Sequence, residues 1–340
     1  MSFIKKLKNR GIRLKNYLIM QARKNTVIVC VLEKRKLMRG YKVYKRVSLE
    51  DNKKIYIFPY NSLGDIYILG LFYKAQNEKF ADPFILVVTG NGCLCIAQMM
   101  GIKNIDVINA RDMRHLAQFA TVLQRELPNV EILHFQYPHN SISSGICNMY
   151  KLNFLTCYET LVFNQAITKK RIDFDLSMPL TEDEYTKWGL VKGKSVIISP
   201  YAKSVPPLPI YFWSTLTARL KKLGFTVITN CNGIHEEPIK GTKRGSFALE
   251  KAVAILEFAG FFIGLRSGFC DIVSSAKCRK IIIYPQNSKQ YLSSLSHYSL
   301  RPLPGARSYK EITYSENPNF ISYLILLLAD TNQCLEERND

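Results

Sequence analysis

The sequence predicts an α/β fold with two doubly wound domains, each built on a parallel β-sheet. Short apolar runs typical of buried strands alternate with longer helical patterns through most of the chain. This alternation stops once, over residues 167–194, and then resumes. The chain has 340 residues, which is more than one hydrophobic core usually holds, so two domains are expected.

The first domain is expected at residues 53–175. Apolar runs predict its strands at 54–58, 84–88, 105–109 and 130–135. Helical patterns follow these strands, beginning near Asp65 and then covering 95–100, 111–126 and 146–165. Because each strand is followed by a helix, neighbouring strands are expected to run parallel.

The interruption at 167–194 is interpreted as an interdomain linker, because it contains Pro179 and the acidic run Glu182–Glu184 but no long apolar run. The second domain is expected at 176–330, followed by a polar tail at 331–340. Its predicted elements are strands 195–199, 226–229, 261–265 and 280–285 and helices 211–223, 247–258 and 319–329. The last helix is expected to return toward the first domain.

Composition limits the classes of protein to be considered. Hydrophobic residues make up 47% of the chain, which is enough for folded cores. The nine cysteines contain no CxxC pair, which favours reduced thiols over a disulfide framework or a metal site. No apolar run reaches the length of a membrane span, and the N-terminus lacks the pattern of a signal peptide.

Residues 1–52 form a basic N-terminal extension. The net charge of the chain is +20, and residues 1–46 contain fifteen basic residues against the single acidic Glu33. Apolar residues near the start fall on one helical face with lysines and arginines around it: Ile4, Leu7, Leu14 and Leu18. This pattern predicts peripheral binding to an anionic membrane surface. A solvated arm, or nonspecific binding of nucleic acid, is the alternative, although no nucleic-acid-binding motif is present.

The loop after the first predicted strand contains the first candidate catalytic residue. Asn61, Ser62 and Gly64 precede Asp65 in a turn that leads from the strand into a helix. A carboxylate at this edge of a sheet could accept a proton from an attacking hydroxyl, a role worth about 10² to 10⁴ in rate. The alternative is that Asp65 only caps the following helix.

A second candidate site follows the strand at 195–199. Lys203 and Ser204 come shortly after its end and could bind a diphosphate through an ammonium group and a hydroxyl. A surface lysine in a proline-rich loop is the alternative interpretation.

The third candidate is the glycine-bracketed turn between two apolar strands. Gly264, Ser267 and Gly268 shape the turn, and the helix after it would direct backbone N–H groups toward an anion. Arg266 would add a positive charge, and Asp271 lies in the first turn of that helix. Phosphate is the expected anion. Alternatively, the glycines serve turn geometry alone and Asp271 complements the helix dipole.

Metal binding is not expected at these sites. Asp173 and Asp175 form a DxD pair of the kind that can hold a divalent cation, but they lie in the predicted linker and do not follow an apolar strand. A solvated linker is therefore the favoured interpretation, and no cofactor is predicted.

Taken together, these segments resemble the bacterial lipopolysaccharide heptosyltransferase-like family of glycosyltransferases, a glycosyltransferase family 9-like pattern. The resemblance is carried by Ser62–Asp65, the strand ending at Ser199–Pro200, the loop 230–242 and the turn 264–271. It implies the GT-B fold, in which two Rossmann-like domains face each other across a cleft. It also implies metal-independent, inverting transfer of a sugar from a nucleotide donor, with Asp65 as catalytic residue and Lys203 as phosphate contact.

The chain departs from the family pattern in two places. About fifty residues precede the first strand, and Phe269–Asp271 stands where the family commonly has a histidine after the glycine. Heptose is therefore not assumed as the donor sugar.

The predicted function is a glycosyltransferase peripheral to the inner membrane, acting from the cytoplasmic side on a lipid-linked or cell-surface glycan such as lipopolysaccharide or capsule. Its expected partners are a nucleotide sugar, a glycan or glycolipid acceptor and an anionic membrane. Two alternatives stay open: a sugar-nucleotide epimerase or hydrolase on the same fold, and a noncatalytic basic protein that binds nucleic acid or anionic lipid.

Overall fold

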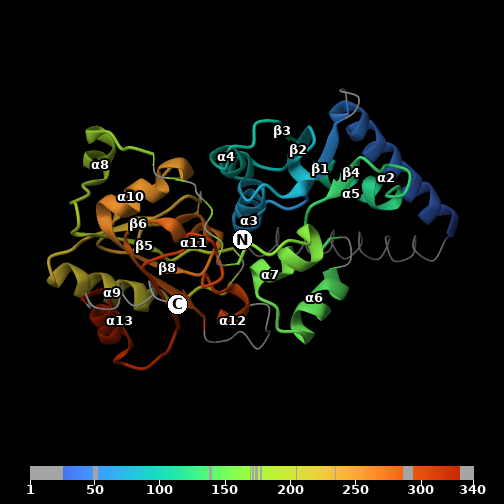
Figure 1. Cartoon of the computed structure of the whole chain (residues 1–340). Coiled ribbons are helices and arrows are strands. Elements are labelled where there is room, and N and C mark those ends of the chain that lie inside the picture. Colours follow the sequence, from blue (N-terminus) through green and yellow to red (C-terminus); the bar gives the residue numbers. More distant parts are fainter. Residues whose placement is uncertain are drawn as a thin grey trace, which may run out of the picture.

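The computed structural model describes residues 26–48, 53–137, 140–168, 170, 172, 175–176, 178–203, 205–233, 235–285 and 294–329. Several predicted features lie outside the described residues: the apolar face from Ile4 to Leu18, Asp173, Ser204 and the polar tail 331–340. The described chain forms two α/β units side by side, each built on its own sheet (Figure 1). The predicted domain limits stay a prediction.

The first unit contains a four-stranded parallel sheet in the order β3-β2-β1-β4. Its strands are β1 (Lys54–Ile57), β2 (Phe84–Val88), β3 (Ile105–Val107) and β4 (Val130–Ile132). The helices after them are α3 (Leu63–Lys74), α4 (Asn91–Met99) and α5 (Ala110–Val122), with a short 3₁₀ turn at Glu78–Phe80. The predicted strands and their parallel direction are confirmed, although β3 and β4 end earlier than expected.

The order of this sheet reverses between β1 and β4. The chain runs outward from β1 to β2 and β3, and then returns to place β4 on the other side of β1, where Ile57 lies opposite Ile132. Such a reversal leaves a crevice beyond the carboxyl ends of the two strands, which is where open α/β sheets bind ligands.

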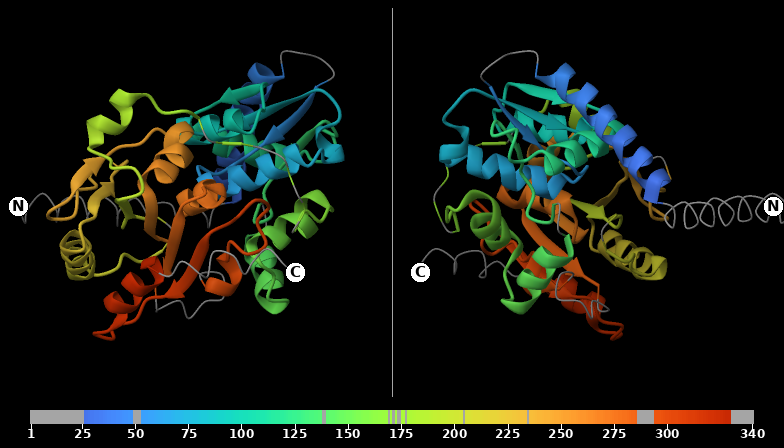
Figure 2. Two further views of the ribbon diagram at one scale, coloured as in Figure 1. Left: turned by 60° about the vertical axis from the view of Figure 1, so that its left-hand side comes forward. Right: turned by 90° about the vertical axis from the view of Figure 1, so that its right-hand side faces the viewer.

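Helix α2 (Thr26–Val47) precedes the first strand and packs along α5. It lies on the side of the first unit that faces away from the second unit (Figures 1 and 2). Val43 and Val47 are buried in an apolar cluster with residues of α5. Gly40 allows the close approach, because a methyl group there would overlap the His115 carbonyl and the Phe119 Cβ. A basic extension is expected from the sequence at this position, but this helix is not.

Four short helical segments follow β4 and precede β5 along the chain: α6 (Asn140–Met149), α7 (Phe154–Tyr158), a π-helical segment (Glu159–Phe163) and α8 (Glu182–Trp188). Helix α8 occupies part of the segment interpreted as a linker. Its acidic first turn complements the helix dipole, and Thr181 and Glu184 form a capping box. The acidic run is therefore a helix start.

The second unit contains a six-stranded parallel sheet in the order β10-β9-β8-β5-β6-β7. Its strands are β5 (Ser195–Ser199), β6 (Thr226–Asn230), β7 (Lys243–Gly245), β8 (Gly260–Leu265), β9 (Arg279–Tyr284) and β10 (Tyr309–Thr313). Its helices are α9 (Ile210–Lys222), α10 (Ala252–Ala259), α11 (Gly268–Ile272), α12 (Leu295–Tyr298) and α13 (Phe320–Ala329), with 3₁₀ turns at Leu249–Lys251 and Val273–Ser275.

Helix α13 packs against α9 and β9. The expectation that the last helix returns toward the first unit is therefore wrong. Its apolar residues Phe320, Leu324 and Leu328 belong to the same buried cluster as Phe212 and Trp213 of α9, and this burial holds the helix on the second unit.

The second sheet reverses its order between β5 and β8, where Ser199 lies opposite Gly264. One apolar cluster continues from this unit into the first, and includes Ile66 and Tyr67 of α3 together with Phe269 and Ile272 of α11. Because α3 packs directly against α11, the carboxyl ends of the strands at the two reversals lie on the sides of the units that face each other.

Candidate active site

Asp65 lies in the first turn of α3, directly beyond the carboxyl end of β1. Its carboxylate accepts three hydrogen bonds: from the Ser62 hydroxyl, from the Tyr158 hydroxyl at 2.6 Å and from Nε2 of His134 at 3.1 Å. The side chain of Asp65 is 13% exposed. All three partners are side chains, so the alternative that Asp65 only caps the backbone of α3 does not explain its contacts.

His134 follows β4, on the other side of the first sheet reversal. Its Nδ1 accepts a hydrogen bond from the backbone N–H of Gln136 at 3.1 Å, so Nε2 carries the proton that is donated to Asp65. The ring lies between aromatic groups, with its centroid 4.4 Å from that of Tyr60. Both nitrogens of His134 are occupied, and Asp65 is left as the group that can accept a proton.

Two opposing effects set the pKa of Asp65. Burial of the carboxylate favours the protonated form, whereas the hydrogen bonds from His134, Ser62 and Tyr158 favour the ionised form. The hydrogen bonds outweigh burial, so the pKa of Asp65 is lowered from its ordinary value. The Tyr158 phenol shows the reverse: burial first, and the charge of Asp65 next, raise its pKa well above the usual range. Tyr158 therefore stays protonated and donates a hydrogen bond to the Asp65 carboxylate as a neutral phenol.

Asn61, Ser62 and Gly64 form the loop between β1 and Asp65 that is predicted to face the acceptor, and Asn61 and Gly64 have different environments. Asn61 is exposed, and its side-chain oxygen accepts a hydrogen bond from the Cys93 thiol at 3.7 Å. Gly64 is buried. A methyl group at this position would overlap the Asp271 carboxylate and lie 3.3 Å from Cα of Gly268. The glycine at position 64 therefore permits the contact between α3 and α11.

Arg266, which was predicted to add a positive charge beside the turn, faces inward. The residue is only 4% exposed, and its guanidinium forms two hydrogen bonds with Asp271, at 2.6 Å and 3.0 Å. It also donates to the backbone carbonyls of Tyr298, at 2.9 Å, and Ser267. A buried arginine is tolerated only when it is paired, and Asp271 supplies that pairing. Through these contacts the buried Arg266–Asp271 pair stabilises the turn at Ser267–Gly268.

Asp271 likewise faces inward, with 2% of its surface exposed. Burial raises its pKa to about 6, and the Arg266 guanidinium opposes that rise. The predicted direct contacts of Arg266 and Asp271 with a donor diphosphate are thus not available in this arrangement, because each group is already bound to the other.

The other residues that were predicted to bind the nucleotide-sugar donor lie near the order reversal of the second sheet. Gly264 ends β8 beside Ser199, and Ser267 precedes α11 with an extended backbone. Gly268 packs against the first unit, where a methyl group would lie 2.6 Å from the backbone nitrogen of Gly64. Lys203 is exposed in the loop after β5. The structure thus brings the turn close to α3, and it leaves Lys203 on the surface of the same edge.

His134 and Tyr158 were not predicted from the sequence. They are 69 and 93 residues from Asp65 along the chain, and only the sheet order and the packing of α7 bring them together. The one available signal was the position of His134 directly after an apolar run. Among the described residues, no group of three or more histidines, cysteines, aspartates or glutamates is arranged to hold a metal ion.

Comparisons with known proteins relate this arrangement to solved glycosyltransferase structures. No protein-family profile and no curated protein sequence matches the chain. A glycosyl transferase family 9 protein from Veillonella parvula is 14% identical, with a TM-score of 0.51 over 82% of this chain and 98% of the other. The E. coli heptosyltransferase WaaC, solved with ADP, is 12% identical, with a TM-score of 0.51 over 81% of this chain and 98% of the other.

These similarities establish the fold: the chain has two parallel-sheet α/β units arranged as in GT-B-like glycosyltransferases. The resemblance predicted from the sequence is confirmed at that level. No helix in the described residues combines the length and apolar character that are needed to cross a membrane.

Proposed function

We propose that this chain is a metal-independent, inverting glycosyltransferase that moves a sugar from a nucleotide-sugar donor to a glycan or glycolipid acceptor, such as lipopolysaccharide or capsule. One observation carries the proposal. Asp65 and the turn at Ser267–Gly268 lie at the order reversals of two parallel sheets, and the two reversals face each other where α3 meets α11. The ADP in the solved WaaC heptosyltransferase supports a nucleotide sugar as the donor class.

In the proposed reaction, Asp65 accepts the proton of the acceptor hydroxyl as that oxygen bonds to the anomeric carbon. The bond from the anomeric carbon to the diphosphate oxygen breaks in the same step, so the configuration inverts. Ionised Asp65 is suited to this role, because its three donors hold the carboxylate in one orientation. Lys203, Ser204 and the backbone N–H groups of the turn are proposed to stabilise the departing diphosphate.

The contact between Gly64 and Gly268 leaves no room for a diphosphate between them. Donor binding at the turn therefore requires α3 and α11 to separate, and their return excludes water during transfer. In this proposal the Arg266–Asp271 pair keeps the turn in shape while the two units move.

The proposal is tested by Asp65→Asn, which keeps the size of the side chain but removes its ability to accept a proton. Transfer is expected to fall by about 10²- to 10⁴-fold, while the nucleotide that raises the melting temperature of the native protein still raises that of the variant. Asp106→Asn, the same change on β3 of the first sheet, is the control and should retain normal transfer. Near-normal turnover by Asp65→Asn would remove the assignment.

The donor nucleotide is found with a thermal-shift panel of UDP, GDP, ADP, CMP and dTDP, since a specific ligand stabilises the folded state. Nucleotide-sugar turnover without any acceptor would instead favour an epimerase or hydrolase. Binding to anionic polymers that persists unchanged after replacement of both Asp65 and Lys203, with no stabilising nucleotide, would favour a noncatalytic basic protein.

The proposed location is the cytoplasmic face of the inner membrane, with residues 1–46 binding anionic lipid. Support comes from the charge of this segment, in which fifteen basic residues face one acidic residue. Flotation of the full chain with anionic vesicles, compared with a chain that begins at Thr26, measures how much of this binding residues 1–25 provide.

A further inference from the structure

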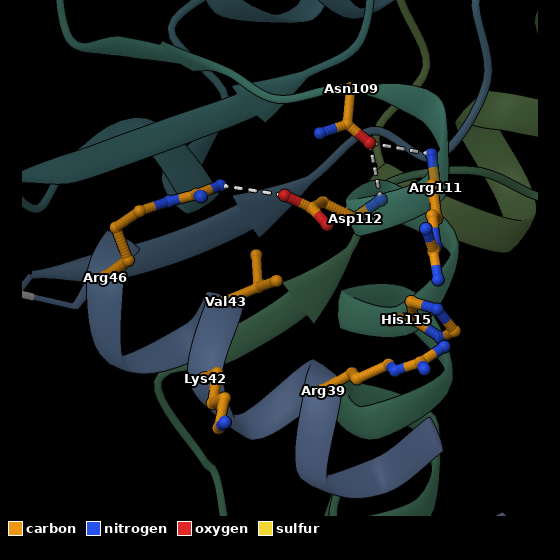
Figure 3. A pocket seen from close by; sticks show the side chains of 8 residues that line it. All are labelled: Arg39, Lys42, Val43, Arg46, Asn109, Arg111, Asp112 and His115. Carbon is orange, nitrogen blue, oxygen red and sulfur yellow. Dashed lines mark hydrogen bonds and ion pairs between the residues drawn. The ribbon is translucent and has the colours of Figure 1, made fainter. Parts of the chain in front are cut away.

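A basic hollow lies between α2 and α5, on the side of the first unit away from Asp65. Its volume is about 430 Å³, and eight residues line it: Arg39, Lys42, Val43, Arg46, Asn109, Arg111, Asp112 and His115. They come from α2 and from the first turns of α5 and its cap (Figure 3). Since α2 lies before the first strand of the α/β fold, this hollow depends on the N-terminal extension.

The charges in the hollow are not balanced. Asp112 is its one carboxylate, and Arg46 forms an ion pair with it at 3.4 Å. No ion pair joins Arg39, Lys42 or Arg111 to a carboxylate in the part of the chain that the structure describes. Figure 3 shows the guanidinium groups of Arg39 and Arg111 directed toward the His115 ring from two different helices.

His115 adds an unsatisfied polar atom at the point where these side chains converge. Its Nδ1 is buried and has no hydrogen-bond partner. Burial lowers the pKa of His115, and the positive charges of Arg39, Arg111 and Arg114 lower it further, while Asp112 opposes them. An oxygen anion in the hollow would offset the positive charges of the arginines and would favour the protonated form of the imidazole.

The rim of the hollow is suited to a lipid surface. A second basic hollow on the same helix is lined by Lys34, Arg35 and Met38 together with Arg39 and Lys42. Met38, which lines this second hollow, is 50% exposed. An exposed apolar side chain beside lysines and arginines is typical of helices that lie at a membrane interface.

We propose that the hollow between α2 and α5 binds the phosphate group of an anionic lipid headgroup, with Arg39, Arg111 and His115 as its ligands. Two guanidinium groups from different helices can each offer paired N–H donors to phosphate oxygens. The site is separate from Asp65 and from the turn at Ser267–Gly268, so it holds the first unit against a membrane without taking part in transfer.

The first test measures binding of the full chain to phosphatidylcholine vesicles with and without phosphatidylglycerol. Arg39→Gln/Arg111→Gln removes two charges inside the hollow, one from α2 and one from α5, and Lys36→Gln/Lys45→Gln removes two charges from α2 outside it. The hollow variant is expected to lose at least about tenfold more affinity for the anionic vesicles than the control, because directed hydrogen bonds to phosphate are lost as well as charge. Equal losses would show nonspecific attraction and overturn the site.

The second test follows the His115 ring by NMR, with His115→Gln used to assign its signal. A short-chain phosphatidylglycerol is expected to raise the pKa of His115 in the native protein but not in Arg39→Gln/Arg111→Gln. An equal rise with inorganic phosphate alone would replace the lipid with a soluble phosphate, and no rise with either probe would remove the site. Transfer to a water-soluble acceptor should be unchanged in the hollow variant, so this result is independent of the proposed enzymatic function.

Discussion

At the scale of single residues, the carboxylate of Asp65 is held in place by hydrogen bonds from side chains alone. Three donors reach it from three parts of the chain: Ser62 from the preceding turn, His134 from the end of β4 and Tyr158 from α7. The cost of burying this charge is met by these bonds, and the pKa of Asp65 stays below its ordinary value. Any change that removes a donor should therefore make Asp65 easier to protonate.

Tyr158→Phe tests this relation, because it removes the hydroxyl and keeps the buried ring. The pKa of Asp65 should rise, so the acid limb of kcat/KM should move upward by about one to two pH units, given that a hydrogen bond to a charged group contributes about 1.5 to 3 kcal/mol. Tyr56→Phe removes another buried phenol, which bonds to the Lys79 carbonyl, and should leave the profile unmoved. An acid limb that does not move in Tyr158→Phe would show that Asp65 does not control the rate.

The same group links stability to pH. The lowered pKa of Asp65 stabilises the folded state at pH values above the ordinary aspartate pKa, and this contribution is lost as the pH falls through the folded-state pKa. In Tyr158→Phe the pKa of Asp65 in the folded state lies closer to its pKa in the unfolded state. The free energy of unfolding of this variant should therefore fall less on acidification than that of the native protein.

At the scale of elements, the two helices α2 and α5 are joined through the close approach at Gly40. An alanine there would favour helix formation by about 1 kcal/mol, but its methyl group would overlap the His115 carbonyl and the Phe119 Cβ. Both contacts are with atoms that cannot rotate away, so the overlap should outweigh the gain in helix propensity.

Gly40→Ala is therefore expected to loosen α2 from α5, with faster amide hydrogen exchange and faster proteolysis between Thr26 and Val47. Gly145→Ala is the matched control, because Gly145 lies in α6 with no atom near its missing side chain, and this change should be neutral or stabilising. Protection of α2 that is equal in Gly40→Ala and in the native protein would contradict the packing described.

Helices and strands with a local sequence signal are predictable, whereas those formed through contacts with distant parts of the chain are not. Strands β2 and β5 match the sequence prediction to the residue, since both are nearly continuous apolar runs. Strand β7, with the sequence Lys-Arg-Gly, has no such pattern and exists because β6 pairs with it. The acidic run before Trp188 was interpreted as a linker, because its capping box was not recognised.

The residues of the candidate site likewise include some that a local signal predicts and some that it does not. Asp65 was predicted because its position after a strand is a local signal. His134 and Tyr158 were missed because their role depends on contacts with residues far along the chain. Arg266 was predicted to add a positive charge beside the turn. Its hydrogen bonds to the buried carboxylate of Asp271, five residues away, give it a structural role instead.

At the scale of the whole molecule, the two α/β units meet where α3 and α11 touch. Gly64 and Gly268 face each other there, and the Asp271 carboxylate packs over Gly64. Because Arg266 holds Asp271 by two hydrogen bonds, the carboxylate cannot yield to an added side chain. The spacing of the units is thus set by two residues that lack side chains.

Gly64→Ala should push α3 away from α11, since its methyl group would overlap the Asp271 carboxylate. Overpacking of this kind costs about 1 to 3 kcal/mol, and we expect a lower free energy of unfolding, a larger radius of gyration and reduced transfer. Gly92→Ala, close to the same junction, meets only the flexible end of Leu63 and should have little effect. A Gly64→Ala protein with native stability and dimensions would contradict this view of the junction.

The continuous apolar cluster across the junction has a consequence for how the protein is made. Ile66 and Tyr67 of α3 are fully buried, and the same cluster contains Phe269 and Ile272 of α11, some two hundred positions later in synthesis. While the ribosome is still adding the second sheet, α3 has not yet met α11, and apolar surface at this junction remains uncovered. Until translation has passed α11, the nascent first unit thus exposes the kind of apolar surface that makes incomplete chains prone to aggregation.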